Sequence, residues 1–247
     1  AHRYSEFDLE QVIILEIIAT NLLGCLTPLG NPQNLFIFHR AGWSAMQFIA
    51  TMLPLVAICA LGLLIATFSV ERHRLGGTTP SLPAIDTRLA VAGALVFALV
   101  LLEIARLIPA WPAALTAAVA WPLFVRRRID VSIVPLFFFA FYVVEGLRSF
   151  HWTLHANVYW TSIAISQVIS NVPAAVLLTP FATDWRELLY GVNAGGCGTI
   201  IASLANLLGW RIYVRESGRE PRFFRRLTAL NFAFLAWASA GGWLLLR

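Results

Sequence analysis

Long uncharged runs are the feature that most constrains what this chain can fold into. Five stretches of the 247-residue sequence contain no Asp, Glu, Lys or Arg: 41–70, 107–125, 149–183, 188–210 and 227–246. About 20 consecutive apolar residues are enough for a helix to cross the hydrocarbon core of a bilayer. Only 13% of all residues are charged, against about 25% in soluble domains. We therefore predict an all-α integral membrane protein with several spanning helices in a lipid bilayer.

One segment of the sequence occurs twice, at 21–35 and again at 193–207. The identical positions are Asn21/Asn193, Gly24/Gly196, Cys25/Cys197, Thr27/Thr199, Asn34/Asn206 and Leu35/Leu207. Both copies bring Gly and Asn into an apolar segment where a spanning helix would otherwise continue. Two interrupted helices at corresponding places in two halves of a chain indicate the binding site of a secondary transporter.

The repeat divides the chain into two parts joined by a polar linker. The first part holds the end of a first repeat with its broken helix (1–40) and a plain spanning helix (41–70), and the linker at 71–87 is rich in Gly and Pro. The second repeat is predicted over residues 88–247. Its expected elements are spans at about 88–107, 110–125 and 131–147, a re-entrant helical hairpin at 156–183, a broken helix at 184–214 that starts with a capping box, and a last span at 227–246.

Arginine sets the orientation, because the net charge of +5 comes from arginine without any lysine. In a membrane protein such an excess reports topology rather than binding to nucleic acid. If 156–183 is a hairpin or two spans, thirteen arginines fall on the side of residue 1 and five on the other. The side of residue 1 is then cytoplasmic, the C-terminus is non-cytoplasmic, and the broken helices cross in opposite directions as an inverted repeat. If 156–183 crosses once, the repeats are parallel.

The expected breaks, at 27–33 and 199–205, free backbone groups at mid-membrane depth, where carbonyls favour Na⁺ and helix N-termini favour anions. A Ser-Asn pair before Pro173 would add a third helix end of this kind. Most of the candidate ligands carry neutral side-chain oxygens, which suit a hard cation. They are Thr27, Gly30, Asn31, Asn34, Ser166, Ser170, Asn171, Thr199, Ser203 and Asn206. The alternative is that these residues only let helices pack closely and form hydrogen bonds.

Three motifs resemble the ion transporter superfamily, in particular its arsenite-permease-like anion transporters and divalent-anion/sodium symporters. They are Leu-Thr-Pro-Leu-Gly-Asn-Pro-Gln-Asn at 26–34, Ser-Asn-Val-Pro at 170–173, and Asn-Ala-Gly-Gly-Cys-Gly-Thr at 193–199. The resemblance implies a scaffold domain and a moving transport domain. It implies Na⁺ between each hairpin tip and its broken helix, here near Ser170, Asn171 and Thr199, with the substrate between the two tips. Dicarboxylate carriers have Ser-Asn-Thr at the tip. Because Val172 stands in the third position here, the resemblance gives less support to citrate or succinate as the substrate.

The predicted function is secondary active transport of a small anion across the inner (cytoplasmic) membrane, coupled to Na⁺ or H⁺ by alternating access. We expect no other cofactor, no enzymatic activity and no nucleic-acid partner, with a homodimer as a possible assembly. Arsenite or metalloid efflux and Na⁺/H⁺ antiport are alternatives within the same superfamily. A passive channel and an integral-membrane metalloenzyme are more distant ones.

The repeat also predicts where a first hairpin would stand. In the second repeat the Ser-Asn tip, with Asn171, comes shortly before Asn193. The counterpart of this tip in the first repeat would stand the same distance before Asn21, just ahead of Ala1. We therefore expect most of the first half, with its share of the site, to lie outside this sequence.

Three further groups of residues are weaker candidates. Glu16 lies within the first broken helix, where a carboxylate is a functional suspect and a possible proton relay, unless it sits near the interface. His151 and His155 have the spacing of two metal ligands on one helix face, with Glu145 as a third in the metalloenzyme reading; an interfacial belt is the alternative. Equivalent thiols at Cys25 and Cys197 would suit arsenite; the alternative is that they are small residues that fill crowded breaks.

Overall fold

The computed structural model describes residues 6–68, 86–109, 111–124, 157–218 and 221–247, together with single positions between 135 and 146. Every regular element in these ranges is a helix. The chain divides into two units: residues 1–75 with 137–247, and residues 76–136. The two units are described one at a time.

Within the described ranges, three helices are long and apolar enough to cross a membrane: α3 (Ala45–Thr67), α4 (Thr87–Ile104) and α11 (Pro221–Leu246). A capping box starts α3, since the Ser44 hydroxyl accepts from the Gln47 N–H and the Gln47 side chain accepts from the Ser44 N–H. Pro221 at its first position lets α11 begin ahead of the expected start at 227. The prediction of an all-helical membrane protein is confirmed.

Both interrupted segments are broken helices. The first comprises α1 (Glu6–Leu22), a 3₁₀ turn (Gly24–Leu26) and α2 (Pro32–Ala41), and the second comprises α9 (Trp185–Ala194) and α10 (Leu204–Ser217). The first break ends at residue 31 rather than 33, because proline is well placed to start a helix. The second break begins at residue 195 rather than 199, because each of its three early glycines costs a helix about 1 kcal/mol.

The segment expected as a hairpin consists of two short helices, α7 (Val158–Ile169) and α8 (Asn171–Leu178), which pack against each other. They meet at Ser170, whose φ of 76° lies in the left-handed region, so a single residue separates the two helices. A 3₁₀ turn (Thr179–Phe181) leads on to α9, which Asp184 caps through the N–H of Arg186. The capping box expected at this start is therefore replaced by a simpler cap.

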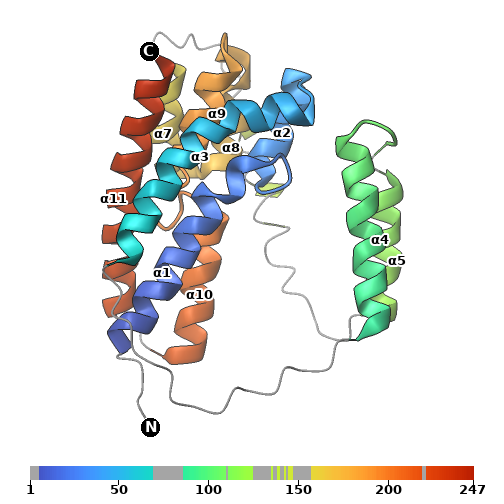
Figure 1. Cartoon of the computed structure of the whole chain (residues 1–247), viewed down its shortest axis with the longest axis horizontal. Helices are drawn as coiled ribbons and strands as arrows, with labels where there is room; N and C mark the ends of the chain where they lie inside the picture. Colours follow the sequence, from blue (N-terminus) through green and yellow to red (C-terminus); the bar gives the residue numbers. More distant parts are fainter. Residues whose placement is uncertain are drawn as a thin grey trace. The chain divides into compact units, whose positions relative to one another are not determined.

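In the larger unit, the two broken helices run antiparallel. Helix α1 packs against α10, while α2 packs against α9 and α8. Figure 1 shows α1 and α10 at one end of this unit and α2 and α9 at the other. The first half of each broken helix thus lies beside the second half of the other. Helices α3 and α11 pack together and also contact α1 and α9.

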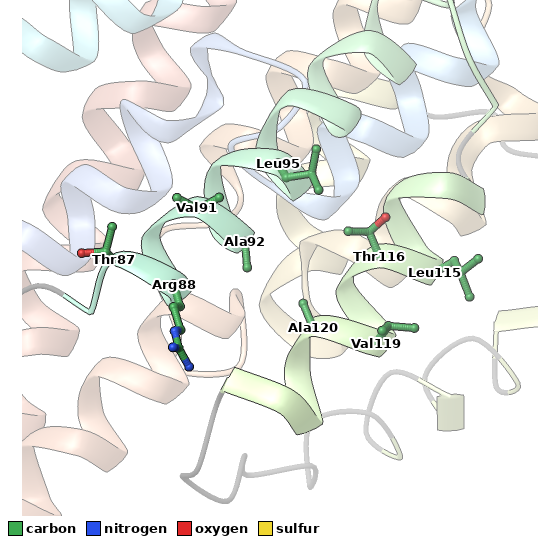
Figure 2. Close-up of a pocket in the computed structure, with 9 residues that line it drawn as sticks. All are labelled: Thr87, Arg88, Val91, Ala92, Leu95, Leu115, Thr116, Val119 and Ala120. Atoms are coloured by element: carbon green, nitrogen blue, oxygen red, sulfur yellow. The ribbon is translucent and has the colours of Figure 1, made fainter.

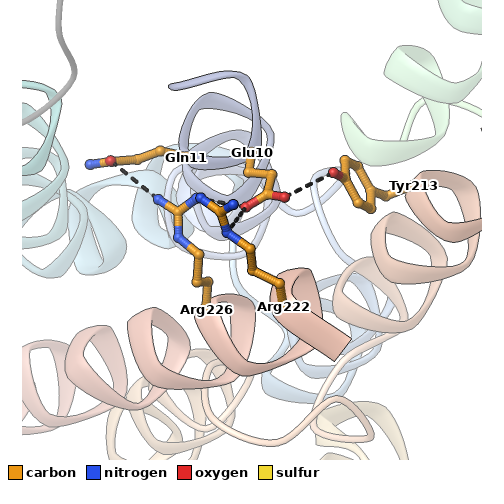
Figure 3. A network of polar contacts seen from close by, with 5 residues as sticks. All are labelled: Glu10, Gln11, Tyr213, Arg222 and Arg226. Atoms are coloured by element: carbon orange, nitrogen blue, oxygen red, sulfur yellow. Dashed lines mark hydrogen bonds and ion pairs between the residues drawn. The ribbon is translucent and has the colours of Figure 1, made fainter. Parts of the chain in front are cut away.

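A buried carboxylate joins α1, α10 and α11 at the end of the unit away from α2 (Figure 3). Glu10 is 2% exposed. Its Oε2 lies 2.7 Å from a guanidinium nitrogen of Arg226 and 3.5 Å from one of Arg222, and its Oε1 accepts from the Tyr213 hydroxyl at 3.2 Å. A charge is tolerated in such a place only when it is paired and hydrogen-bonded. This network therefore fixes where α1 starts against its two neighbours.

The smaller unit contains α4 and α5 (Trp111–Phe124), which pack against each other. Asp86 caps α4 by accepting from the N–H groups of Arg88 and Leu89 at 3.0 and 3.3 Å. A groove of about 870 Å³ lies between these helices, and Figure 2 shows the residues that line it. Apart from Thr87, Arg88 and Thr116 its lining is apolar, as expected for helices that face hydrocarbon.

Candidate functional site

The structure brings the tip between α7 and α8 onto the second break. The backbone N–H of Asn171 donates to the carbonyl of Ala202 at 2.9 Å, and the Ser170 hydroxyl donates to the same oxygen at 3.4 Å. On the other side, the Thr199 hydroxyl donates to the backbone carbonyl of Gln167 at 2.9 Å. Three of the predicted site residues, Ser170, Asn171 and Thr199, thus lie at one junction between the α7–α8 connection and a broken helix.

The side chain of Asn171 is the unusual member of this junction. It is 4% exposed, yet its amide forms no hydrogen bond with any residue that the structure describes. A Cβ built on Gly196 would lie only 2.9 Å from the amide nitrogen, so the side chain rests directly on the backbone of the break. Both polar atoms of this amide keep some accessible area, so water or a ligand can reach them. Such a group is expected where a ligand or water completes the bonding.

Ser166 and Ser203 have local roles in this structure. The Ser166 hydroxyl donates to the carbonyl of Ser162 at 2.7 Å, and these two serines face Gly191 and Gly195 of α9. A Cβ on either glycine would lie within 3 Å of a serine Cβ. Small residues at this spacing let two helix backbones approach closely. The Ser203 hydroxyl caps α10 by accepting from the Asn206 N–H at 3.2 Å.

Two asparagine pairs tie the broken helices together. Asn21 donates to the side-chain oxygen of Asn206 at 2.9 Å, and Asn193 donates to that of Asn34 at 2.7 Å. All four residues are 3% exposed or less. The offset between the two copies of the repeat relates Asn21 to Asn193 and Asn34 to Asn206. Each pair is therefore the sequence counterpart of the other.

Further amide groups brace the same region. Asn206 also donates to the carbonyls of Gly196 and Thr199, both at 3.1 Å. In the first broken helix, Asn31 donates to the carbonyl of Asn21 at 3.3 Å, and Gln33 donates to the side-chain oxygen of Asn193 at 3.1 Å. The side chains of Asn31, Asn34 and Asn206 thus hold backbone groups, and Asn34 and Asn206 also each bond to an asparagine of the other broken helix.

The first break is more open than the second. Thr27 and Gly30 are both exposed, whereas the second break lies mostly buried beneath α7 and α8. Gly30 packs so tightly on Gly24 that a Cβ there would lie 1.5 Å from the Gly24 carbonyl oxygen. These two predicted site residues therefore do not join the junction of Ser170, Asn171 and Thr199.

Sequence reasoning missed Gln167, which contacts the second break more extensively than any predicted residue. Its amide donates to the carbonyls of Gly195 at 2.9 Å and Cys197 at 3.1 Å, and its side-chain oxygen accepts from the Thr199 N–H at 2.9 Å. The only signal in the sequence is a polar residue in an uncharged run, one turn before Ser170.

Glu16 is exposed on α1 in an otherwise mainly apolar groove of about 610 Å³ between α1 and α3. Its carboxylate has no partner within the described part of the chain. The role of Glu16 as a proton relay therefore stays a prediction.

The geometry of the described residues gives little support to the metal and thiol hypotheses. His151 and His155 lie outside the described residues. Within the ranges that the structure covers, no three His, Cys, Asp or Glu side chains gather in a way that could hold a metal ion. Cys25 and Cys197 are both buried and free, and the Cys25 thiol donates to the carbonyl of Leu22 at 2.9 Å. The Cys25 thiol thus satisfies a carbonyl that the end of α1 frees.

Comparison with known proteins finds a family and several relatives. The family model described as citrate transporter (CitMHS) matches residues 1–187. An uncharacterized transporter of Methanocaldococcus jannaschii is 34% identical over 221 residues, which cover 85% of this chain and 61% of that protein. The inner membrane protein YbiR of Escherichia coli is 30% identical, over 99% of this chain and 68% of its own length.

Shorter similarities link the chain to Na⁺/H⁺ antiporters named NhaB. That of Haemophilus influenzae strain Rd is 39% identical over 69 residues, which cover 27% of this chain and 13% of the antiporter. The chain thus spans 61% of the Methanocaldococcus jannaschii transporter and 68% of YbiR, but only a small part of the antiporters. No solved structure gives a significant match.

Proposed function

The chain belongs to the citrate transporter (CitMHS) family, and from that premise we propose that it forms part of a secondary active transporter for a small anion. The proposed mechanism is alternating access, with Na⁺ or H⁺ as the coupling ion. We propose that the membrane is the cytoplasmic one and that the C-terminus lies on its non-cytoplasmic side. The relative YbiR, which is named an inner membrane protein, supports this location.

The observation that carries the proposal is the side-chain amide of Asn171 on the second break, which stays accessible although the residue is only 4% exposed and which bonds to no described residue. A neutral amide oxygen is a good ligand for a hard cation. Broken helices provide such sites in transporters because their freed backbone groups lie at mid-membrane depth. We assign Na⁺ to the space around Ser170, Asn171 and Thr199, with α7 and α8 as a re-entrant hairpin.

Antiparallel broken helices support the second element of the proposal, an inverted repeat. An axis that exchanges the two repeats would exchange Asn21 with Asn193 and Asn34 with Asn206. The same axis would place the hydrogen bond from Asn21 to Asn206 onto the one from Asn193 to Asn34, and both of these bonds are present. Neither pair depends on the other, so their agreement supports the two-fold relation.

An anionic substrate is supported by the helix ends at the junction. Helix α8 begins at Asn171 and α10 begins at Leu204, and the hydrogen bond from Asn171 to the Ala202 carbonyl brings these starts together. The N-terminus of a helix carries partial positive charge and free N–H groups, which favour anions. A bound Na⁺ beside them would add to this potential.

The similarity to NhaB favours a second candidate function, Na⁺/H⁺ antiport without an organic or oxyanion substrate. In that case Glu16 is the proposed proton carrier, since it is a carboxylate on the open face of α1 beside apolar side chains of α3. Purified protein in vesicles separates the two candidates. Antiport predicts Na⁺ efflux driven by a pH gradient with no anion present, and its loss in Glu16→Gln.

The test of the main proposal is thermal unfolding of the purified protein in detergent with increasing NaCl, against choline chloride at equal ionic strength. We expect a saturable rise in melting temperature with Na⁺, since a ligand that binds only the folded state stabilises it. Asn171→Ala should abolish this rise. Tyr159→Phe removes a buried hydrogen bond, to the carbonyl of Ser239 at 2.6 Å, from the start of α7, and should keep it.

Transport itself is tested in proteoliposomes with a panel of oxyanions and carboxylates under imposed Na⁺ and pH gradients. Uptake of one anion that follows either gradient supports the proposal. Uptake that is indifferent to both gradients would identify a passive channel instead. A Na⁺ response that survives Asn171→Ala unchanged would show that the site lies elsewhere.

A further inference from the structure

Gln167 lies on α7, one turn before Ser170, and every polar group of its side chain is bound. The amide nitrogen donates to the carbonyls of Gly195 and Cys197, and also to Ile163 within its own helix at 3.2 Å. The side-chain oxygen accepts from the N–H of Thr199. One side chain thus satisfies both donors and acceptors of a segment that is distant in the sequence.

The backbone around Gln167 is shaped to fit it. Gly198 has a φ of 109°, a conformation that residues with a side chain rarely adopt. A Cβ there would lie 2.1 Å from the side-chain oxygen of Gln167. The segment from Gly195 to Thr199 therefore wraps around a single amide.

This amide determines which oxygens are left for an ion. The end of α9 frees carbonyls that would otherwise attract a cation. Gln167 engages those of Gly195 and Cys197, and its own backbone carbonyl accepts from the Thr199 hydroxyl. The side-chain amide of Asn171, which bonds to no described residue, lies against the break at Gly196.

We propose that Gln167 is a positioning residue that holds the second break in its ion-binding shape and restricts that site to a monovalent cation. The inference rests on the proposed Na⁺ site at Asn171. Gln167 acts through the backbone rather than as a ligand, because its donors face the carbonyls and its oxygen is occupied by Thr199. A neutral donor here also means that no fixed negative charge compensates a divalent cation.

Two substitutions separate the two parts of the proposal. Gln167→Met keeps the length and loses every cross-link. It should raise the Na⁺ concentration for half-maximal thermal stabilisation by about tenfold or more, which corresponds to the loss of one to two hydrogen bonds. Gln167→Glu keeps the acceptor for Thr199 but turns a carboxylate oxygen towards two carbonyls. It should lower the melting temperature without added cations and create a stabilisation by Ca²⁺ that the wild type lacks.

Tyr159→Phe is the matched control, because it removes a buried hydrogen bond from the same helix without touching the break. The Tyr159 hydroxyl donates to the carbonyl of Ser239 at 2.6 Å. This variant should lower the melting temperature in the absence of cations yet keep the wild-type Na⁺ midpoint.

The possible outcomes distinguish a failure of this inference from a failure of the proposed function. A wild-type Na⁺ response with an unchanged midpoint in Gln167→Met overturns the role of Gln167 and leaves the proposed function intact. A wild type without a Na⁺ response overturns the ion site and this inference with it. If Gln167→Met does not fold, Gln167→Glu decides: a Na⁺ midpoint equal to that of the wild type and no response to Ca²⁺ refute the inference.

Discussion

The two asparagine pairs allow a test of the repeat that uses energetics alone. Asn21 with Asn206, and Asn34 with Asn193, are each joined by one side-chain hydrogen bond. Replacing both members of a pair by alanine, singly and together, gives a double-mutant cycle that isolates the energy of that bond. If the pairs are counterparts, the two cycles should return similar coupling energies.

The donor–acceptor distances of 2.9 and 2.7 Å set the expected magnitude. A neutral hydrogen bond contributes about 0.5–1.5 kcal/mol to stability, and cycles between membrane helices average about 0.6 kcal/mol. We expect a coupling of about 0.6–1.5 kcal/mol for each pair. The single Asn206→Ala should cost more, about 2–3 kcal/mol, because it also abandons the carbonyls of Gly196 and Thr199.

Reversible unfolding by SDS in mixed micelles, followed by the fluorescence of the nine tryptophans, measures the free energy of unfolding of each variant. The control is the cycle between Asn21→Ala and Tyr159→Phe, whose side chains share no hydrogen-bond partner. Its coupling should lie within about 0.3 kcal/mol of zero, as for independent sites. Couplings near zero for both true pairs, or a control coupling as large as theirs, would refute the pairing.

Three further substitutions test the packing around the site by thermal unfolding. Gly30→Ala should destabilise by about 3 kcal/mol or more, the upper end of overpacking, because its Cβ would lie 1.5 Å from the Gly24 carbonyl; a loss under about 1 kcal/mol would contradict that contact. Arg226→Gln should cost about 3 kcal/mol by removing the closest partner of buried Glu10, and adding Glu10→Gln should recover part of it; no recovery would argue against the ion pair. Trp237→Phe should cost about 1 kcal/mol, since its indole donates to a carbonyl of α3 at 2.8 Å, and an unchanged melting temperature would speak against that bond.

The elements of this fold could be predicted where local chemistry decides them. Several glycines and prolines close together at 24–32, and three glycines at 195–198, disfavour a continued helix, so both breaks were predicted close to where they occur. Uncharged runs likewise identify α3 and α11. The interruption at Ser170 is shorter than expected, since the sequence indicates that a helix ends near Pro173 but not that a single residue separates α7 from α8.

The contacts of the site depend on pairing between distant segments and were less predictable. The repeat marked Asn21 and Asn193 as equivalent, but equivalence in sequence does not say that each bonds to the far end of the other repeat. Gln167 belongs to no recognisable motif. A single polar residue in an apolar helix gives the same sequence pattern whether it faces a break or a neighbouring helix. Only the antiparallel packing of α1 with α10 and of α2 with α9 turns these side chains towards one another.

The two breaks differ in how far protein covers them. Thr27 and Gly30 are exposed, whereas Ala202, the counterpart of Gly30 in the second repeat, is fully buried beside the tip of α7 and α8. Non-helical backbone at membrane depth is tolerated only when protein covers it or when it lines a wet cavity. A break that faced lipid would leave several backbone groups unsatisfied, each at a cost of several kcal/mol. The first break must therefore be covered by other protein segments or open to water. If the repeats are related by a two-fold axis, the element that covers it has the geometry of α7 and α8 and presents its own tip towards Thr27.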